Sequence, residues 1–231
     1  MPAIKMTKRK VEAIREAVGD DIELCIDVNN RLDLYSAIRF ARAFEPYNLL
    51  FIEDPICHHE ASPSTYARLV EKTKTPIACG ENIYTVWDFR NYLENHALDM
   101  LHPDVCHTGV FQAKKIAALG EAYHIPVSFH NPNSPLSAVI SANVAATIPN
   151  FVVLEFVRGY AYPGEDPEVP IWTEYIMNPP LSKLVSDGYL KLPEGPGWGV
   201  EIDEKELEKH PFDREHQWLY RRKDGSFFGQ K

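Results

Sequence analysis

Apolar positions repeat with two different periods along most of the chain. Between Val11 and Val18 they recur every three or four residues among charged side chains, with Ile14 on the same stripe. This is the period of a helix, and Gly19 follows as a residue that commonly ends one. The next apolar run, residues 22–28, is short and rich in β-branched side chains, which is typical of a strand.

The same alternation of helix and strand continues along the chain. The expected helices cover residues 34–44, 66–72, 86–93, 110–123 and 136–146, and the expected strands cover residues 49–53, 77–79, 99–104, 125–130 and 151–156. Strands that alternate with helices of about 10–15 residues indicate βαβ units and a parallel sheet. The pattern therefore predicts an α/β fold.

Residues beyond 157 lack this alternation and are rich in glycine and proline, for example at 178–180 and 193–197. We expect a first domain, residues 1–157, that forms the sheet and carries the site. We expect the remainder, residues 158–231, to be a C-terminal extension of irregular structure and short strands that packs on the end of the sheet and on the capping region.

Each expected strand ends in an ionisable residue. In chain order these are Asp27, Glu53, Glu81, Asp104, His130 and Glu155, at successive spacings of 26, 28, 23, 26 and 25 residues. In an α/β barrel the carboxyl ends of the strands converge on the face that carries the chemistry. Acids from three successive strands form an oxygen-rich cage suited to Mg²⁺. A single acid after a strand is more often a helix cap, but the whole set points to a site.

Short motifs surround these positions. They are Asp27-Val28-Asn29-Asn30, Phe51-Ile52-Glu53-Asp54-Pro55, Cys79-Gly80-Glu81-Asn82, His102-Pro103-Asp104 with Thr108-Gly109-Val110, His130-Asn131-Pro132 and Leu154-Glu155-Phe156. Their combination and order resemble the enolase superfamily, in its mandelate racemase-like branch, over about residues 8–205. The resemblance implies a partial TIM-type (β/α) barrel made of strands three to eight, plus the C-terminal extension.

The resemblance also implies a metal centre. In that family the first three acids bind Mg²⁺, which assigns Asp27, Glu53 and Glu81 as the metal ligands here. A divalent ion at this place stabilises the enediolate that forms when a proton α to a carboxylate is removed.

Three further strand-end residues are implied to be catalytic. His130 would be the base, Asp104 would orient its ring and raise its basicity, and Glu155 would contact the developing oxyanion or assist acid catalysis. Loss of a β-hydroxyl would then give a 2-keto-3-deoxy sugar acid, so we expect an acid-sugar dehydratase, which is a hydro-lyase. A racemase or epimerase of a 2-hydroxy acid, or a catalytically inactive fragment, is the alternative.

Four residues are candidates for substrate contacts: Asn29, Arg31, His107 and Asn131. Asn29 and Arg31 follow the first implied metal ligand, where groups that bind hydroxyls are useful. Asn131 belongs to the motif that contains the implied base. His107, three residues after Asp104, either faces the substrate or is a loop histidine with no role.

Members of the family carry a capping domain and two more strands before the first metal ligand, and the second of these strands ends in a lysine-containing motif. Here Asp27 lies only 26 residues after Met1, and Lys5, Lys8 and Lys10 fall just before or inside the first helix. We therefore expect a truncated gene product or a misassigned start. A six-stranded sheet would have two unpaired edges for another chain to cover, and we expect the full-length form to be a homo-oligomer.

Composition narrows the class of partner and the location. The 231 residues carry a formal net charge of −9, which argues against nucleic acid, since binding phosphates needs a clustered basic surface. A small sugar acid is the expected ligand. No apolar run approaches the roughly 20 residues of a membrane span, and the first residues lack the apolar core of a signal peptide, so we expect a cytoplasmic protein without membrane contact.

The cysteines and a histidine pair receive simple interpretations. The four cysteines, Cys25, Cys57, Cys79 and Cys106, are far apart and form no Cys-x-x-Cys pair, which favours reduced thiols over a disulfide framework or a zinc site. His58 and His59 look like a metal-binding pair, but side chains of adjacent residues diverge, so a solvated loop is the preferred interpretation.

Overall fold

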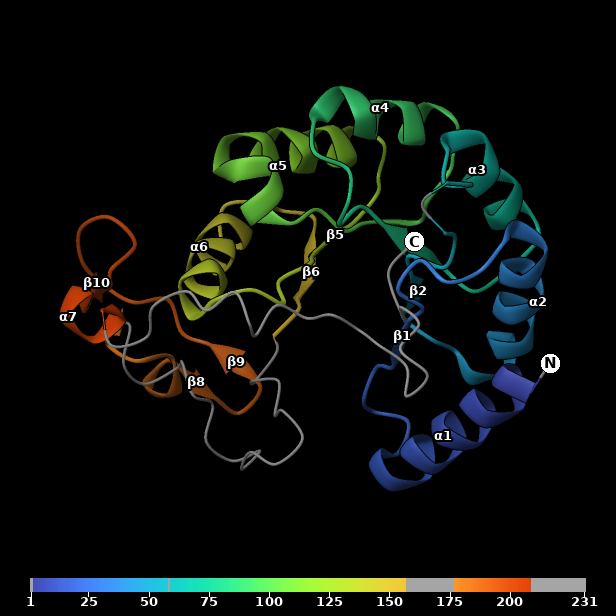
Figure 1. The fold of residues 1–231 in the computed structure, drawn as a ribbon, viewed down its shortest axis with the longest axis horizontal. Helices are drawn as coiled ribbons and strands as arrows, with labels where there is room; N and C mark the ends of the chain where they lie inside the picture. The colour runs from blue at the N-terminus through green and yellow to red at the C-terminus, as the bar shows by residue number, and fades with distance from the viewer. Residues whose placement is uncertain (1, 58, 157–176, 209–231) are drawn as a thin grey trace.

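A curved parallel sheet with helices along its outer side forms the body of the molecule. The computed structural model describes residues 2–57, 59–156 and 177–208. Six strands lie in chain order, β1-β2-β3-β4-β5-β6, and each pairs in parallel with its neighbours. Helices follow one another in an arc outside this sheet (Figure 1). The arrangement is a half-barrel, which confirms the expected partial (β/α) barrel.

The elements alternate as the hydrophobic pattern predicts. The strands are β1 (Cys25–Asp27), β2 (Phe51–Glu53), β3 (Ile77–Cys79), β4 (Met100–Leu101), β5 (Val127–Phe129) and β6 (Phe151–Leu154). The helices are α1 (Pro2–Val18), α2 (Leu34–Phe44), α3 (Pro63–Glu71), α4 (Val86–Glu94), α5 (Val105–Ala122) and α6 (Pro135–Ala145), and a 3₁₀ turn, η1 (Glu45–Tyr47), follows α2.

Two local expectations need correction. The apolar stripe of α1 is not buried as a whole, because Val11 is 5% exposed whereas Ile14 is 47% and Val18 is 40% exposed. The expected strand at 99–104 shortens to the two residues of β4, and Asp104 instead makes an isolated parallel bridge with His130. That bridge sets two strand-end residues side by side.

Most helices begin at a cap that is separate from the strand-end acids. The side chains that accept a backbone hydrogen bond at the first turns of α2, α3, α4 and α6 belong to Asp33, Ser62, Thr85 and Ser134. Glu53 and Glu81 are therefore not helix caps. Asp104 is one, because its carboxylate accepts from the Cys106 N–H at the start of α5.

The main core lies between the sheet and the helices. Phe44, Leu69, Phe89 and Ile116, from four different helices, are completely buried in it. Helix α5 approaches the sheet closely because Gly120 carries no side chain where it meets Leu101 of β4. Packing of this kind holds the strands in place and so fixes where their carboxyl ends lie.

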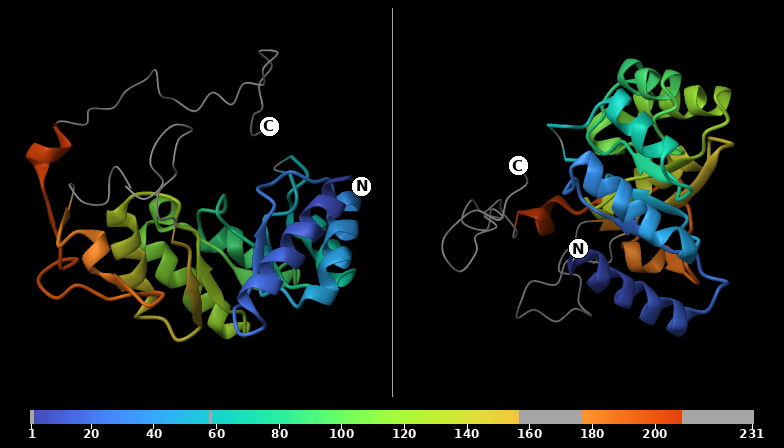
Figure 2. Two further views of the ribbon diagram at one scale, coloured as in Figure 1. Left: turned by 90° about the horizontal axis from the view of Figure 1, so that it is seen from below. Right: turned by 90° about the vertical axis from the view of Figure 1, so that its right-hand side faces the viewer.

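The described part of the C-terminal extension consists of short elements. They are β7 (Met177–Asn178), η2 (Leu181–Lys183), β8 (Val185–Ser186), β9 (Tyr189–Leu190), β10 (Glu201–Ile202) and α7 (Glu204–Leu207). β7 pairs with β10 and β8 with β9, both antiparallel. These elements lie at the β6 end of the arc (Figure 2).

The extension packs on a helix. Met177, Leu181 and Leu184 form a second small core with Ala138 and Val139 of α6. The expected short strands are present, and the described ones pack on α6 and on Phe156, which lies just after β6. The division at residue 157 stays a prediction, since residues 158–176 and 209–231 lie outside the described part. None of the described helices is long and apolar enough to cross a bilayer.

Adding a single methyl group at Gly120 should destabilise the fold. In Gly120→Ala the new Cβ would collide with the Leu101 side chain and lie 3.1 Å from the Ile125 carbonyl oxygen. We expect the free energy of unfolding, measured by urea denaturation, to fall by about 1–3 kcal/mol, the usual cost of overpacking. Ala118→Ser, at an exposed position of the same helix, is the control and should change it little. Equal stability of the two variants would contradict the close contact.

Candidate functional site

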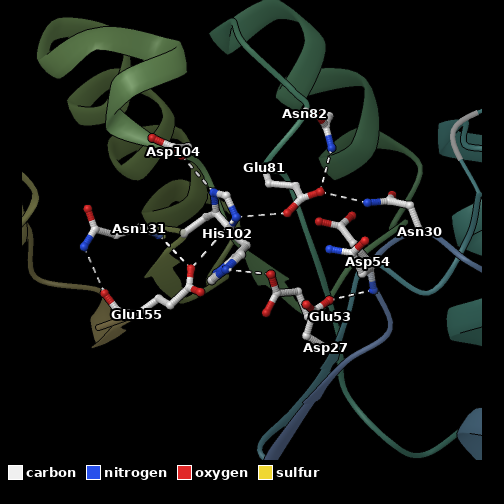
Figure 3. Close-up of polar contacts among 12 residues, drawn as sticks. Asp27, Asn30, Glu53, Asp54, Glu81, Asn82, His102, Asp104, Asn131 and Glu155 are labelled. Carbon is white, nitrogen blue, oxygen red and sulfur yellow. Dashed lines mark hydrogen bonds and ion pairs between the residues drawn. The ribbon is translucent and has the colours of Figure 1, made fainter. Parts of the chain in front are cut away.

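Carboxylates and two histidines gather where the parallel strands end (Figure 3). Because neighbouring strands are parallel and in register, Asp27 lies beside Glu53 at the ends of β1 and β2. Glu53, Glu81 and His130 each offer one ligand atom, and these three atoms lie within 4.8 Å of one another. Convergence of strand ends thus produces a compact polar centre from residues far apart in the sequence.

His130 lies at the middle of this centre, just after β5. Its Nδ1 is 2.8 Å from Oδ2 of Asp104, and its Nε2 is 3.0 Å from Oε2 of Glu81 and 3.9 Å from Oε2 of Glu155. Burial disfavours the charged form of the ring. The hydrogen bonds to Asp104 and Glu81 and the negative charges of Glu155 and Glu81 outweigh this effect, and they raise the pKa of His130 to about 10.

Asp104 is fixed from several directions at once. It is 1% exposed, accepts the Cys106 N–H at 2.6 Å, and accepts the Asn133 side-chain amide at 2.8 Å. Burial opposes its charge, but the hydrogen bonds from His130, Cys106 and Asn133 lower its pKa below the ordinary value. An ionised Asp104 held in this way sets the orientation of the His130 ring.

Glu81 follows β3 and receives three donors. Its Oε1 accepts the side-chain amides of Asn30, at 2.8 Å, and Asn82, at 2.7 Å, while Oε2 faces His130. Burial opposes the charge of Glu81. The hydrogen bond and positive charge of His130, together with the hydrogen bonds from the Asn30 and Asn82 amides, outweigh this effect and lower the pKa of Glu81. Asn29 and Asn30 have φ values of 52° and 56°, a left-handed conformation that asparagine tolerates, and this turn carries Asn30 to Glu81.

Glu53 is held against a buried histidine. His102, 2% exposed, places Nε2 at 3.1 Å from Oε1 of Glu53, which is an ion-pair distance, although the geometry is not that of a hydrogen bond. The other ring nitrogen of His102 contacts the Ser128 hydroxyl. The His102 ring also lies edge-to-face with His130, with ring centroids 5.7 Å apart. His102, from the motif that contains Asp104, is therefore buried and lies against a strand-end acid.

Asp54, the residue after Glu53, is a further buried acid next to these groups. It is 5% exposed, its Oδ1 accepts the Tyr66 hydroxyl at 3.2 Å, and its Oδ2 has no hydrogen-bond partner among the described residues. Burial and the charges of Glu81 and Glu53 raise its pKa well above the ordinary value. Burial and these neighbouring charges therefore disfavour a further negative charge on Asp54.

Asp27 and Glu155 occupy the two outer strands of the set. Asp27 is exposed, accepts the Asn29 N–H at 2.6 Å, and is not part of the compact group of Glu53, Glu81 and His130. Partial loss of hydration, together with the charges of Glu53, Glu81 and Glu155, raises the pKa of Asp27 to about 6. Burial also raises the pKa of Glu155, although the hydrogen bond from the Asn131 N–H and the charge of His130 act to lower it.

The four expected substrate contacts lie around this centre in different settings. Asn131 is 4% exposed, and its side chain bonds to the Glu155 carbonyl oxygen and the Ser137 hydroxyl, so its present contacts position Glu155. His107, in the first turn of α5, is exposed and donates from Nδ1 to the Glu81 carbonyl oxygen at 2.8 Å. Their roles toward a substrate stay predictions.

Asn29 and Arg31 lie at the rim, after β1. The Arg31 guanidinium contacts Oδ1 of Asn29 at 3.4 Å, and Arg31 is exposed. This contact places an amide and a cation beside Asp27, which is a suitable setting for a substrate carboxylate or hydroxyl. Here too the substrate contact stays a prediction.

The donor set of the centre fits a hard divalent cation. Glu53, Glu81 and the adjacent Asp27 supply carboxylate oxygens from three successive strands, with the charge of Asp104 and Glu155 close by. His130 balances only part of this negative charge. Oxygen ligands with excess negative charge suit Mg²⁺, so Asp27, Glu53 and Glu81 could hold such an ion.

Several residues of the site were missed by the sequence analysis. Asn30, Asn82 and Asn133 each bond a strand-end acid, and Ser128 and Tyr66 support His102 and Asp54. Asn30 and Asn82 lie within the motifs of the first and third strand ends, and that closeness was the available signal. Nothing in the local pattern pointed to Ser128 or Tyr66.

Comparison with known proteins gives a consistent result. The family model described as enolase C-terminal domain-like matches residues 2–206. A D-xylonate dehydratase of Haloferax volcanii is 34% identical over 215 residues, which cover 93% of this chain and 49% of that protein. A D-gluconate dehydratase of Thermoproteus tenax is 31% identical, covering 94% of this chain and 43% of that protein.

A solved structure agrees with these relatives. An enolase from Agrobacterium radiobacter, determined with sodium and L-malate bound, superposes with a TM-score of 0.83 and 31% identity over 97% of this chain and 57% of that one. The chain spans about half the length of the curated relatives it matches.

Neutralising Asp104 should lower the basicity of His130. Asp104→Asn keeps a side-chain oxygen that can cap α5 but removes the charge beside Nδ1. In chelator-treated protein we expect the pKa of His130, about 10 in the native chain, to fall toward its ordinary value. An NMR titration of the ring carbon-bound protons measures it, with Asp20→Asn, at a fully exposed side chain, as the control. An unchanged pKa in Asp104→Asn would contradict the dyad.

The raised pKa of His130 also determines how the stability of the fold changes with pH. The folded-state pKa of His130 lies above the unfolded value of about 6.5. Its contribution to the stability of the metal-free protein is therefore complete below about pH 6.5 and is lost as the pH rises through about 10. Unfolding of wild type and Asp104→Asn across this range should show a smaller loss in the variant.

Proposed function

The chain belongs to the enolase C-terminal domain-like family, and on this premise we propose that it carries the metal-binding and base-bearing face of a Mg²⁺-dependent acid-sugar dehydratase. The supporting observation is the position of His130, which is bonded to Asp104 through Nδ1 and presents Nε2 to the strand-end acids. Dehydratases of D-xylonate and D-gluconate are among the relatives, which supports a sugar acid as the substrate class.

Each of the chain's residues would have a distinct task. Asp27, Glu53 and Glu81 would hold the ion, which when bound stabilises negative charge developing on the substrate carboxylate. With Glu81 holding the ion, the contact of Glu81 with Nε2 of His130, 3.0 Å in this structure, would be released. Nε2 would then be the nitrogen that takes the α-proton, because Nδ1 is engaged by Asp104 at 2.8 Å. The charge of Asp104 would stabilise the imidazolium that results.

Glu155 is suited to the second half of the reaction. It lies 3.9 Å from His130 through Oε2, and its raised pKa favours a protonated carboxyl that can donate a hydrogen bond. A donor at this place would stabilise an enediolate oxygen or help a β-hydroxyl to leave as water. The product would be a 2-keto-3-deoxy sugar acid. Asn131 would keep Glu155 in place, and Asn29, Arg31 and His107 would contact the substrate.

A racemase or epimerase of a 2-hydroxy acid is the second candidate. It is favoured by one observation: a solved mandelate racemase/muconate lactonizing enzyme-like protein from Rubrobacter xylanophilus is 36% identical to this chain and superposes with a TM-score of 0.79. We place the dehydratase first because relatives of this chain are sugar-acid dehydratases. Racemisation also needs a base on each face of the α-carbon, and the second histidine of the centre, His102, is 2% exposed and engaged by Glu53 and Ser128. We also propose a cytoplasmic location and a homo-oligomer for the full-length form.

Removal of one carboxylate charge should weaken cation binding. In Glu53→Gln the neutral amide is a poorer ligand for a hard cation, so we expect Mg²⁺ affinity to fall at least about tenfold by isothermal titration calorimetry. Glu71→Gln neutralises an exposed carboxylate at the end of α3 and should bind Mg²⁺ as the native chain does. Unchanged affinity in Glu53→Gln would exclude Glu53 as a ligand.

The activity itself is tested by proton NMR in D₂O with Mg²⁺ and a panel of sugar acids. We expect a 2-keto-3-deoxy product from at least one of them. His130→Asn should reduce the rate by about 10²–10⁴-fold, the usual contribution of a general base, while Mg²⁺ binding stays near normal. Exchange of the α-proton without a new product would favour racemisation. Silence across the panel with Mg²⁺ bound would favour the inactive fragment.

A further inference from the structure

A second group of metal-binding side chains lies in the loop between β2 and α3. Cys57, His59 and Glu60 each offer one ligand atom, and these atoms lie within 4.8 Å of one another. Cys57 Sγ is 3.5 Å from Nε2 of His59. The group is distinct from the strand-end centre, because it contains a sulfur and shares no residue with Glu53, Glu81 and His130.

The backbone of the loop brings these three side chains together. The N–H groups of Glu60 and Ala61 donate to the Cys57 carbonyl oxygen at 2.9 and 3.0 Å, which closes one helix-like turn. Residues three apart on such a turn lie on the same side, so Cys57 and Glu60 face the same way. The Cys57 N–H donates in turn to the Leu32 carbonyl oxygen at 2.8 Å, which ties the turn to the segment after β1.

The carboxylate of Glu60 is fixed by the next element. Its Oε2 accepts the backbone N–H of Leu34, the first residue of α2, at 3.2 Å. Such a bond orients a carboxylate before an ion arrives and reduces the ordering that binding requires. Glu60 also borders an open depression with Asp33 and Arg68, so an ion can reach the group from solvent.

The separation of the sulfur and the ring nitrogen agrees with tetrahedral zinc. Zinc–sulfur bonds of about 2.3 Å and zinc–nitrogen bonds of about 2.0–2.1 Å at a tetrahedral angle place the two ligand atoms about 3.5 Å apart. The separation of Cys57 Sγ and His59 Nε2 is 3.5 Å. Thiolate and imidazole are donors that select zinc, whereas Mg²⁺ takes oxygen ligands.

We propose that Cys57, His59 and Glu60 form a Zn²⁺ site with a fourth position for water, separate from the strand-end cation site. His59 is exposed in a turn, as the solvated-loop interpretation expects, and the proposal adds a ligand role to this exposed ring. His59 and Glu60 are neighbours in the chain, yet their ligand atoms lie within 4.8 Å of each other and of Cys57 Sγ. His58 lies outside the described residues. A bound Zn²⁺ would join the β2–α3 loop to the start of α2 through the Glu60–Leu34 bond.

Thiol alkylation tests the proposal at a single residue. The native chain, saturated with Mg²⁺ to occupy the strand-end site, is treated with N-ethylmaleimide with and without equimolar Zn²⁺. Modification of each cysteine is followed by peptide mass spectrometry. We expect Zn²⁺ to slow alkylation of Cys57 at least about tenfold, because its thiolate becomes a ligand, and to leave the exposed Cys106 unchanged.

Variants distinguish a shared zinc site from binding by the Cys57 thiol alone or by the strand-end acids. His59→Ala removes an exposed ring and should abolish the zinc protection of Cys57, whereas His124→Asn, at another exposed histidine, should retain it. Glu53→Gln should also retain it. Equal alkylation of Cys57 with and without Zn²⁺ would overturn the proposal. Full zinc protection of Cys57 in His59→Ala would also overturn the proposal, because the Cys57 thiol alone would then bind the ion. Loss of this protection in Glu53→Gln would overturn it too, because the strand-end acids would then be the zinc ligands.

Discussion

Repulsion between carboxylates is the constraint around which this half-barrel is arranged. A parallel sheet brings its strand ends together, and here five of the six ends carry an acid. Several like charges held within a few ångströms are unfavourable unless donors or cations accompany them. His130 is the group that relieves this repulsion most directly, because its ring bonds Asp104 on one side and Glu81 on the other.

The local structure around each acid serves the same electrostatic requirement. Separate caps for α2, α3, α4 and α6 leave Glu53 and Glu81 free to face the centre. Asp104 combines two tasks, since one oxygen caps α5 and the other bonds His130. The Asp104 carboxylate is thus fixed at the start of α5, and a shift of that helix start would move the His130 ring.

Periodicity predicted the alternation of helices and strands and the set of six ionisable strand ends, and the resemblance of the motifs to a known family implied the partial barrel. Those signals are local, because a strand of three or four residues and the helix after it are encoded by neighbouring side chains. Contacts such as Asn30 to Glu81, or Tyr66 to Asp54, join segments that only the completed packing brings together. The same holds for Ile14, whose exposure depends on what packs beside α1.

Exposure of the acids follows the position of their strands in the sheet. Glu53, Glu81 and Asp104, on inner strands, are 9%, 8% and 1% exposed. Asp27 on β1 is exposed, and the Glu155 side chain after β6 is 31% exposed. The inner acids Glu81 and Asp104 have lowered pKa values because they are supplied with donors, whereas the pKa values of the two outer acids are raised.

This difference makes the outer acids the adjustable part of the site. β1 and β6 are the edges of the described sheet, and Val152 and Val153 of β6 are 45% and 39% exposed. Any protein surface that comes to lie along these edges removes water from Asp27 and Glu155 and adds its own donors or charges. The pKa values of His130, Asp104 and Glu81 are set by contacts inside the chain. The ionisation of Asp27 and of Glu155, on which their proposed roles as cation ligand and acid depend, therefore responds to what covers the two edge strands.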